Sequence, residues 1–273
     1  MLRLWLILLA VVALTAGCDD QTNPRDVNPP AAPRGLYSVT GDGRVTLHWL
    51  SNTEGDVVGY RIYQSRCATC VDGPYDPVGT TSLTIFDVTG LADGVTRYFA
   101  VAAIDRAGNE SALSYDDVFD TPRPEGFGRA LSNASTAPAT AGYDFSAYSV
   151  RPFDDPATDM YFSTSSGVSS MICPFTDTDI QDAGYASSLD AVDVAPNAGW
   201  SPTGAVELIP GHCYVVWTFD NHYAKFRVTS LSASQVSFDW AYQTDPGNPE
   251  LRQKKAHDES APRVRRMIAV AAR

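Results

Sequence analysis

Short runs in which apolar and polar residues alternate recur along the first half of the chain. In the run RVTLHWL at residues 44–50, Val45, Leu47 and Trp49 share one face of an extended backbone. Similar runs at residues 57–64, 82–88 and 97–105 are separated by turn-forming residues, with no clear helical period between them. Strands at this spacing predict a β-sandwich over residues 34–122.

Runs rich in aromatic residues predict a second small antiparallel β-domain over residues 143–245. Its strands are expected at residues 159–164, 211–219, 222–230 and 235–243. Pro, Gly, Ala, Ser and Thr dominate the stretch between the two β-rich regions, so residues 123–142 are predicted to be a linker. The predicted fold class is therefore all-β, a β-sandwich followed by a second antiparallel β-domain.

A hairpin is the clearest local feature of this second β-domain. Two apolar runs within residues 212–229 flank Asp220 and Asn221, which both tolerate a left-handed backbone, so a two-residue turn is expected. In that register Phe219 lies opposite His222. One face is then almost entirely apolar and is expected to point into the core: Cys213, Val215, Trp217, Phe219, His222, Ala224, Phe226 and Val228.

The first β-rich region resembles a fibronectin type III module. The motifs that carry this resemblance are, in order, Pro33 with Leu36, Val45-x-Leu47-x-Trp49, Gly59-Tyr60-x-Ile62-Tyr63, Gly90-Leu91, Tyr98-x-Ala100-Val101-x-Ala103 and Gly108-Asn109-Glu110-Ser111. The resemblance implies that Trp49 is the buried core aromatic residue, that Tyr98 is the tyrosine-corner residue and also belongs to the structural core, and that the module is a spacer or protein-contact surface. The chain departs from the pattern in two respects: Leu91 lies seven residues before Tyr98, one more than usual, and Cys67 and Cys70 lie in a loop that normally has no cysteine.

The N-terminus has the layout of a secretory signal peptide, with Arg3, an apolar run and small residues over residues 1–17. The sequence Leu-Thr-Ala-Gly-Cys that ends at Cys18 resembles the bacterial lipobox, although Thr15 stands where Leu is usual. The resemblance implies that Cys18 becomes the first residue of the mature protein and carries lipid, which makes a membrane the first expected partner. Residues 18–33 are polar and rich in proline, as expected for a tether.

Four further cysteines are expected to form disulfides, because the chain is predicted to leave the cytoplasm. Cys67 and Cys70 are two residues apart, and a local disulfide between them is favoured over a zinc site or a redox site. No helix begins after Cys70, as a redox pair would need, and no second closely spaced pair exists for zinc. Cys173 and Cys213 are the cysteines that remain, and a disulfide between them is expected. The alternative is that both are buried free thiols.

The charge and the motifs restrict the classes of function. The formal net charge is −12, which argues against a nucleic acid as partner, since phosphate binding needs a basic face. The basic tail at residues 246–273 is expected to be frayed, the alternative being a short helix on anionic lipid. Motifs for a serine nucleophile, a zinc protease or a phosphate loop are absent. Asp177, Asp179 and Asp182 lie in a run similar to a calcium loop, but the run lacks Asp at the fifth position, Gly at the sixth and Glu at the twelfth, so a solvated acidic loop is favoured.

The C-terminal β-domain also resembles the C-terminal half of the HmuY family. The motifs are Gly211-x-x-Tyr214-x-Val216, the run from Asp220 to Val228, and Val236-x-Phe238-x-Trp240-x-Tyr242. Some members of that family bind haem through two axial side chains. His212 and His222 are predicted on opposite faces of the hairpin and far apart along it, so they do not form such a pair. A His–Met pair that uses Met160 or Met171 stays open.

These observations predict a non-catalytic protein of the bacterial cell envelope, anchored by lipid and exposed outside the cytoplasm. A fibronectin-like spacer would present a β-domain that binds an extracytoplasmic protein, a glycan or a small molecule, with no cofactor and no metal. A haem- or metal-binding lipoprotein is the first alternative. A carbohydrate-active enzyme is the second, because the paired carboxylates of such enzymes are distant in sequence.

Overall fold

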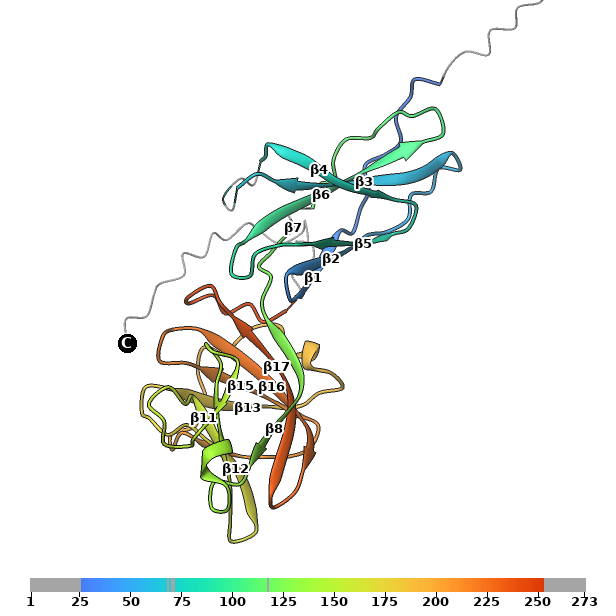
Figure 1. Cartoon of the computed structure of the whole chain (residues 1–273). Coiled ribbons are helices and arrows are strands. Elements are labelled where there is room, and N and C mark those ends of the chain that lie inside the picture. The colour runs from blue at the N-terminus through green and yellow to red at the C-terminus, as the bar shows by residue number, and fades with distance from the viewer. Residues whose placement is uncertain (1–25, 68, 70–71, 117, 253–273) are drawn as a thin grey trace, which may run out of the picture.

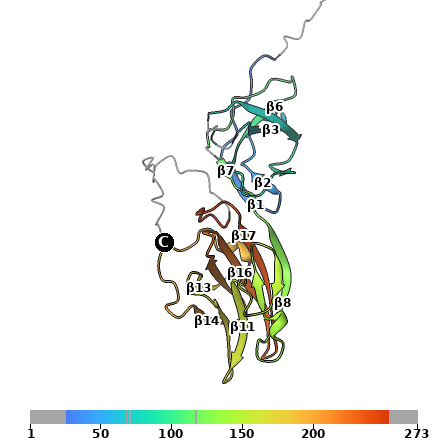
Figure 2. The ribbon, with the colours of Figure 1, turned by 60° about the vertical axis from the view of Figure 1, so that its left-hand side comes forward.

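The computed structural model describes residues 26–67, 69, 72–116 and 118–252, and it shows two β-sandwiches stacked end to end (Figure 1). The chain enters the second sandwich from the base of the first, and the molecule is elongated (Figure 2). Every paired strand in the described part is antiparallel, which confirms the predicted all-β fold class. Within the same residues, no helix has the length and apolar character needed to cross a membrane.

The N-terminal sandwich packs a three-stranded sheet against a four-stranded sheet. The first sheet has the order β1 (Tyr37–Gly41), β2 (Arg44–His48) and β5 (Ile85–Thr89). The second has the order β4 (Tyr75–Thr81), β3 (Val57–Ser65), β6 (Arg97–Asp105) and β7 (Val118–Asp120). Alternate side chains of both sheets fill the core between them, as the sequence pattern predicts.

Of the two aromatic residues expected in this core, only Trp49 lies there. Trp49 is 5% exposed, and its ring meets the ring of Tyr60 edge-on at 5.3 Å between centroids. Tyr98 is half-buried on the opposite face of β6, where its ring packs against Phe119, and the neighbouring Phe99 occupies the core. The core assignment of Tyr98 is therefore wrong. The strand RYFAVAAID is apolar on both faces, so alternation alone does not say which face points inward.

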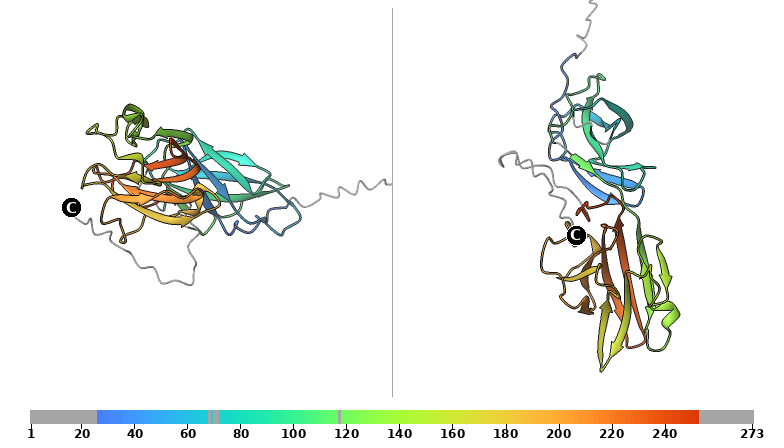
Figure 3. Two further views of the ribbon diagram at one scale, coloured as in Figure 1. Left: turned by 90° about the horizontal axis from the view of Figure 1, so that it is seen from below. Right: turned by 90° about the vertical axis from the view of Figure 1, so that its left-hand side faces the viewer.

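The C-terminal sandwich consists of two five-stranded sheets, seen as two layers in Figure 3. One sheet has the order β10 (Ser149–Arg151), β9 (Gly142–Asp144), β11 (Met160–Ser165), β12 (Val168–Ile172) and β14 (Ala205–Glu207). The other has the order β13 (Asp179–Tyr185), β15 (His212–Trp217), β16 (Tyr223–Leu231), β17 (Gln235–Gln243) and β8 (Glu125–Ser132). Two single 3-10 turns, η1 (Pro138–Thr140) and η2 (Leu189–Ala191), lie outside the sheets.

The predicted linker at residues 123–142 is wrong, because it contains β8 and η1. β8 pairs with β17 along most of its length and forms the edge of its sheet. Its sequence EGFGRALS has two glycines and no regular alternation, and only Leu131 is fully buried, so an edge strand of this kind resembles a loop in sequence. The segment before residue 253 also belongs to the sandwich, since Leu251 is buried against Val215. The predicted signal peptide, Cys18 and the tail from residue 253 lie outside the described residues.

The hairpin of β15 and β16 has a register one residue away from the predicted one. Trp217 pairs with Tyr223, so five residues rather than two form the loop, and Thr218 closes it by hydrogen bonds with His222. A shift of one residue reverses the faces of a strand. Tyr214 and Val216 of β15 therefore lie in the core, whereas Cys213 and Val215 lie on the outer face; on β16, Ala224, Phe226 and Val228 lie inward as predicted.

The predicted Cys173–Cys213 disulfide is wrong for the same reason. Cys173 lies in the core between the two sheets, Cys213 lies on the outer face, and both are buried free thiols. Other segments cover the outer face of β15, so both of its faces are apolar. The alternation of apolar and polar residues therefore does not reveal the register of this strand. Cys67 is not one of the free thiols, and Cys70 lies outside the described residues, so the local Cys67–Cys70 disulfide stays a prediction.

Candidate binding site at the junction of the two sandwiches

The junction between the sandwiches is held by the short segment that connects β7 to β8. The backbone N–H of Arg123 donates to the carbonyl of Gly41, and its Nε donates to the carbonyl of Leu251 at 3.0 Å. The N–H of Gly94 donates to the carbonyl of Pro122 at 2.8 Å. Gly94 approaches the end of β17 so closely that a Cβ there would lie 2.6 Å from Thr244 Oγ1. These contacts fix the base of the first sandwich on the top of the second.

Two cationic side chains are buried at and beside this junction. Arg123 is fully buried, with Glu125 at 3.6 Å, and burial lowers its pKa while Glu125 and three aspartates oppose the shift. Neither Nη atom of Arg123 has a hydrogen-bond partner within the described residues. Lys225 is also fully buried; its Nζ donates to the carbonyl of Val192, and burial lowers its pKa well below the usual range. Burying such groups is costly in free energy, so we expect the contacts around them to hold the junction in one arrangement.

An exposed tyrosine is held in a constrained conformation next to this junction. Tyr148 lies in the loop between β9 and β10, has a φ of 53°, and is 40% exposed. Its ring stacks on the ring of Trp240, which is 4% exposed, at 5.5 Å between centroids and 17° between planes. Trp240 in turn packs on the backbone of Gly126, where a Cβ would lie 2.5 Å from the indole Nε1. One face of the Tyr148 ring is therefore supported from behind.

Asp220, in the loop between β15 and β16, lies in a hydrogen-bonded network beside these aromatic rings. Ser146 Oγ donates to Asp220 Oδ2 at 3.0 Å and lies 3.0 Å from the hydroxyl of Tyr242, while His222 Nδ1 lies 3.2 Å from Asp220 Oδ1. Burial alone would raise the pKa of Asp220, but the hydrogen bonds from His222, Thr218 and Ser146 outweigh it and hold that pKa well below its ordinary value. Asp220 is therefore an ionised carboxylate across the physiological range.

The pKa of Asp159 is shifted in the opposite direction, upward. It is 3% exposed, and its Oδ2 accepts the backbone N–H of Phe145 at 2.8 Å, which positions the start of the Tyr148 loop. Burial, followed by the charges of Asp144 and Asp220, outweighs this hydrogen bond and raises the pKa of Asp159 to about 7. This carboxyl group therefore titrates near neutral pH and acts on the loop through the Phe145 N–H.

The N-terminal sandwich places two carboxyl groups beside the junction. Asp42 is exposed in the turn between β1 and β2, and Asp93 Oδ1 accepts the N–H of Gly43 at 3.0 Å. Asp42 directly follows Gly41, whose carbonyl accepts the N–H of Arg123. Burial, and then the charges of Asp93 and Asp42, raise the pKa of Tyr148. The acidic turn of one sandwich therefore lies within electrostatic range of the exposed ring of the other.

The structure does not bring the sequence-predicted ligand residues together. His212 pairs with Asp182 at 3.0 Å at one end of β15, and His222 lies in the loop at the other end. Met160 and Met171 are fully buried in the core. Asp177, Asp179 and Asp182 form no carboxylate cluster; within the described residues, the group that gathers its carboxylate oxygens within 4.8 Å is Asp26, Asp56 and Asp105.

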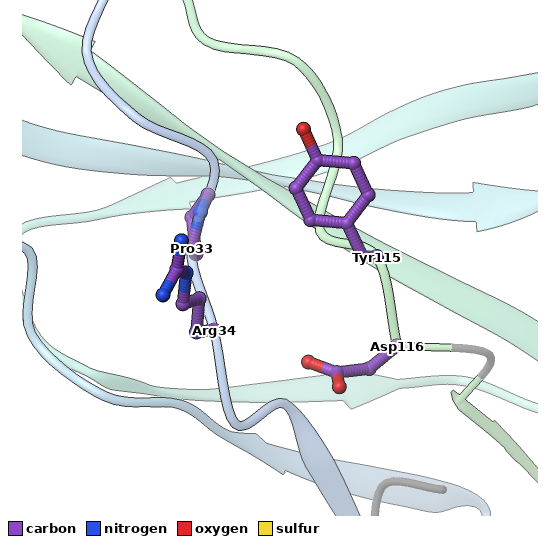
Figure 4. Close-up of a pocket in the computed structure, with 4 residues that line it drawn as sticks. All are labelled: Pro33, Arg34, Tyr115 and Asp116. Carbon is purple, nitrogen blue, oxygen red and sulfur yellow. The ribbon is translucent and has the colours of Figure 1, made fainter. Parts of the chain in front are cut away.

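A separate pocket of about 430 Å³ lies on the N-terminal sandwich (Figure 4). Pro33 and Arg34 line one side, and Tyr115 and Asp116 line the other. Tyr115 is 70% exposed, and Asp116 Oδ2 is engaged by the N–H of Leu36. Among the described residues, no second aromatic ring stacks behind the exposed ring of this pocket.

Comparisons with known proteins relate the chain to glycosidases. No protein-family model matches it. Exoglucanase B from Cellulomonas fimi is 26% identical over 244 residues, covering 86% of this chain and 22% of that protein. Amylopullulanase from Thermoanaerobacterium thermosulfurigenes is 31% identical over 112 residues, covering 41% of this chain and 6% of that protein. Chitinase Chi52 from Paenibacillus xylanexedens is 37% identical over 100 residues, covering 36% and 17%. The chain thus spans about a fifth or less of these relatives' own length.

Two solved structures are similar to part of the chain. A Fn3-like protein from Clostridium thermocellum is 27% identical, covers 34% of this chain and 92% of that chain, and has a TM-score of 0.29. A β-1,2-glucanase from Parabacteroides distasonis is 26% identical, covers 36% of this chain and 14% of that chain, and has a TM-score of 0.30. The HmuY resemblance and the lipid anchor stay predictions.

Proposed function

We propose that this chain is a non-catalytic, extracytoplasmic protein that binds polysaccharide. The observation that carries the proposal is the match to exoglucanase B, which spans 86% of this chain but only 22% of that enzyme. A segment that forms a minor part of several glycosidases has the character of an accessory region. Here the N-terminal sandwich would hold the C-terminal sandwich away from the membrane, and lipid on Cys18 would anchor both.

The geometry of the junction supports a binding role rather than a hydrolytic one. Three of its carboxyl groups already accept hydrogen bonds from the protein: Asp159 from the Phe145 N–H, Asp93 from the Gly43 N–H, and Asp220 from several donors. A glycosidase needs one carboxyl group free to give a proton and a second free to act on the sugar or on water. Exposed rings such as that of Tyr148 offer contact area at a low cost in conformational entropy.

The experiment that tests this proposal uses a soluble chain that begins at residue 19. Co-sedimentation with insoluble cellulose, chitin and starch is expected to retain the protein on at least one of them. No reducing sugar is expected to be released from the polymer that retains it. Failure to bind all three polymers, or release of reducing ends, would contradict the proposal.

The lipid anchor is tested separately in a bacterium that processes lipoproteins. The full chain is expected in the membrane fraction, with a mass that corresponds to an acylated Cys18. Cys18→Ser is expected to move the protein to the soluble fraction or to leave it unprocessed. An unmodified Cys18 in a soluble parent protein would rule the anchor out and leave the binding proposal standing.

A further inference from the structure

We propose that the two sandwiches together form one binding site for a neutral hexopyranose chain, with Tyr148 as its platform and Asp42 and Asp93 as its hydrogen-bond acceptors. The inference rests on the proposed function and deepens it, because it names the site and the class of sugar. It also assigns the N-terminal sandwich a part in recognition beyond that of a spacer.

The conformation of Tyr148 is the first observation that supports the site. A non-glycine residue at a φ of 53° is uncommon, and such backbone persists only where the surroundings hold it in place. Trp240 stacks behind the ring and Gly126 lies behind Trp240, so two layers support the side chain. The residue is nevertheless 40% exposed. A ring that is stacked against Trp240 and still partly exposed is arranged to receive a flat apolar surface.

A hexopyranose ring offers such a surface. Its C–H groups form an apolar face that packs on an aromatic ring, while its hydroxyl groups point outward along the rim and need acceptors. Asp42 is exposed and Asp93 is half-buried on the N-terminal side of the Tyr148 ring. Ser146 and Asp220 lie beside the same loop on the C-terminal side. Acceptors therefore flank the platform from both sandwiches.

The charge of the site selects against anionic sugars. Asp42 and Asp93 lie within electrostatic range of Tyr148, Asp220 accepts a hydrogen bond from Ser146 of the same loop, and the chain as a whole carries a formal charge of −12. A uronic acid or a phosphorylated polymer would meet like charge at short range, which opposes binding. A neutral sugar meets acceptors only.

The site requires the fixed arrangement of the two sandwiches. Asp42 and Asp93 are held on the Tyr148 side of the junction by the contacts of Arg123 with Gly41 and Leu251 and by the packing of Gly94 against Thr244. Neither sandwich alone presents both the ring and the acidic turn. We therefore expect substitutions on either side of the junction to weaken binding of the same ligand.

The test measures binding of cellohexaose, maltohexaose and chitohexaose to the chain from residue 19 by calorimetry, with polygalacturonate as the anionic probe. Tyr148→Ala is expected to weaken binding at least tenfold, and Tyr148→Phe, which keeps the ring, is expected to change it less than about threefold. Asp42→Asn alters an exposed side chain and so preserves folding; it is expected to weaken binding about three- to tenfold. Tyr115→Ala, at the separate pocket, is the matched control and should leave affinity unchanged.

Each outcome decides between the proposals. If the parent chain binds a hexasaccharide and both Tyr148→Ala and Asp42→Asn bind it equally well, the junction site is wrong while the proposed function stands. Loss of binding in Tyr115→Ala alone would place the site at the pocket of Figure 4 and overturn the inference. Binding of polygalacturonate as tightly as of a neutral hexasaccharide would overturn the charge argument. No binding of any probe, together with no co-sedimentation, would remove the proposed function itself.

Discussion

The two sandwiches share an architecture, but they place their charged groups differently. In the N-terminal sandwich the ion pairs lie at the surface, as in Arg66–Asp76, whose side chains are 61% and 49% exposed. Both sandwiches bury carboxyl groups, such as Asp120 in the first and Asp159 in the second, but the fully buried basic side chains of the described residues, Arg123 and Lys225, lie at the junction and in the C-terminal sandwich. Exposed pairs contribute little to stability, whereas a buried charge that loses its partner destabilises strongly.

This difference indicates which part of the molecule is specialised. The C-terminal sandwich buries Lys225 and holds a tyrosine with a positive φ in its exposed aromatic loop. Features that oppose stability tend to persist at functional sites. The contrast therefore agrees with recognition at the junction.

The largest expected effect comes from removing the guanidinium at the junction. Arg123→Ala leaves Glu125 without its partner and removes the bond to the carbonyl of Leu251. We expect the free energy of unfolding to fall by about 3–5 kcal/mol and the two sandwiches to unfold in separate transitions. Urea denaturation followed by tryptophan fluorescence measures both effects. Arg66→Ala, at an exposed pair, is the control and should leave the curve unchanged; equal curves for the two variants would break the comparison.

The next effect concerns the dependence of stability on pH. The folded-state pKa of Asp159 is about 7, above its ordinary 3.8, so the folded state holds a proton that the unfolded state has released between these values. Its stabilising contribution is full below pH 3.8 and is lost as the pH rises through about 7. Asp159→Asn keeps an acceptor for Phe145 and removes this loss. We expect it to raise the free energy of unfolding at pH 8 by up to about 4 kcal/mol, as urea titrations at several pH values would show.

For Asp220 the dependence of stability on pH has the opposite sign from that for Asp159. Its folded-state pKa is depressed, so its contribution is present above its ordinary pKa and is lost as the pH falls toward the folded-state value. Asp220→Asn is expected to cost about 1–3 kcal/mol at pH 7 and to change little under strongly acidic conditions. Urea titrations at both ends of the pH range test this. A variant that destabilised equally at both would show that shape, rather than charge, explains the effect.

The N-terminal sandwich was predicted well because, in a strand with one polar and one apolar face, the alternation shows which side chains point into the core. Prediction failed where both faces of a strand are covered: Tyr98 of β6 was placed inward, and β15 was placed one residue out of register. The edge strand β8 was missed because its two glycines and its lack of regular alternation are typical of a loop.

The junction site could not be read from the sequence at all. Tyr148 lies in a short loop without periodicity. Its supporting ring, Trp240, lies on β17, which is far from this loop in the sequence. Asp42 and Asp93 belong to the other sandwich. No local pattern links residues that only the packing of two units brings together. The nearest signal was the aromatic content of β17, which pointed to a binding domain but to no particular residue.

The smallest expected effect is that of a reducing agent, and it separates the sandwiches once more. Cys173 and Cys213 are free thiols on different sides of one sheet, so reduction should leave unfolding of the C-terminal sandwich unchanged. The predicted Cys67–Cys70 disulfide would confine any effect of reduction to one loop of the N-terminal sandwich. In the chain from residue 19, Ellman's reagent should therefore find two thiols after denaturation without reductant, and almost none before it, because burial raises the pKa of both thiols. Four thiols would show that Cys67 and Cys70 are unpaired, and none would show that Cys173 and Cys213 are joined, which requires a different register for β15.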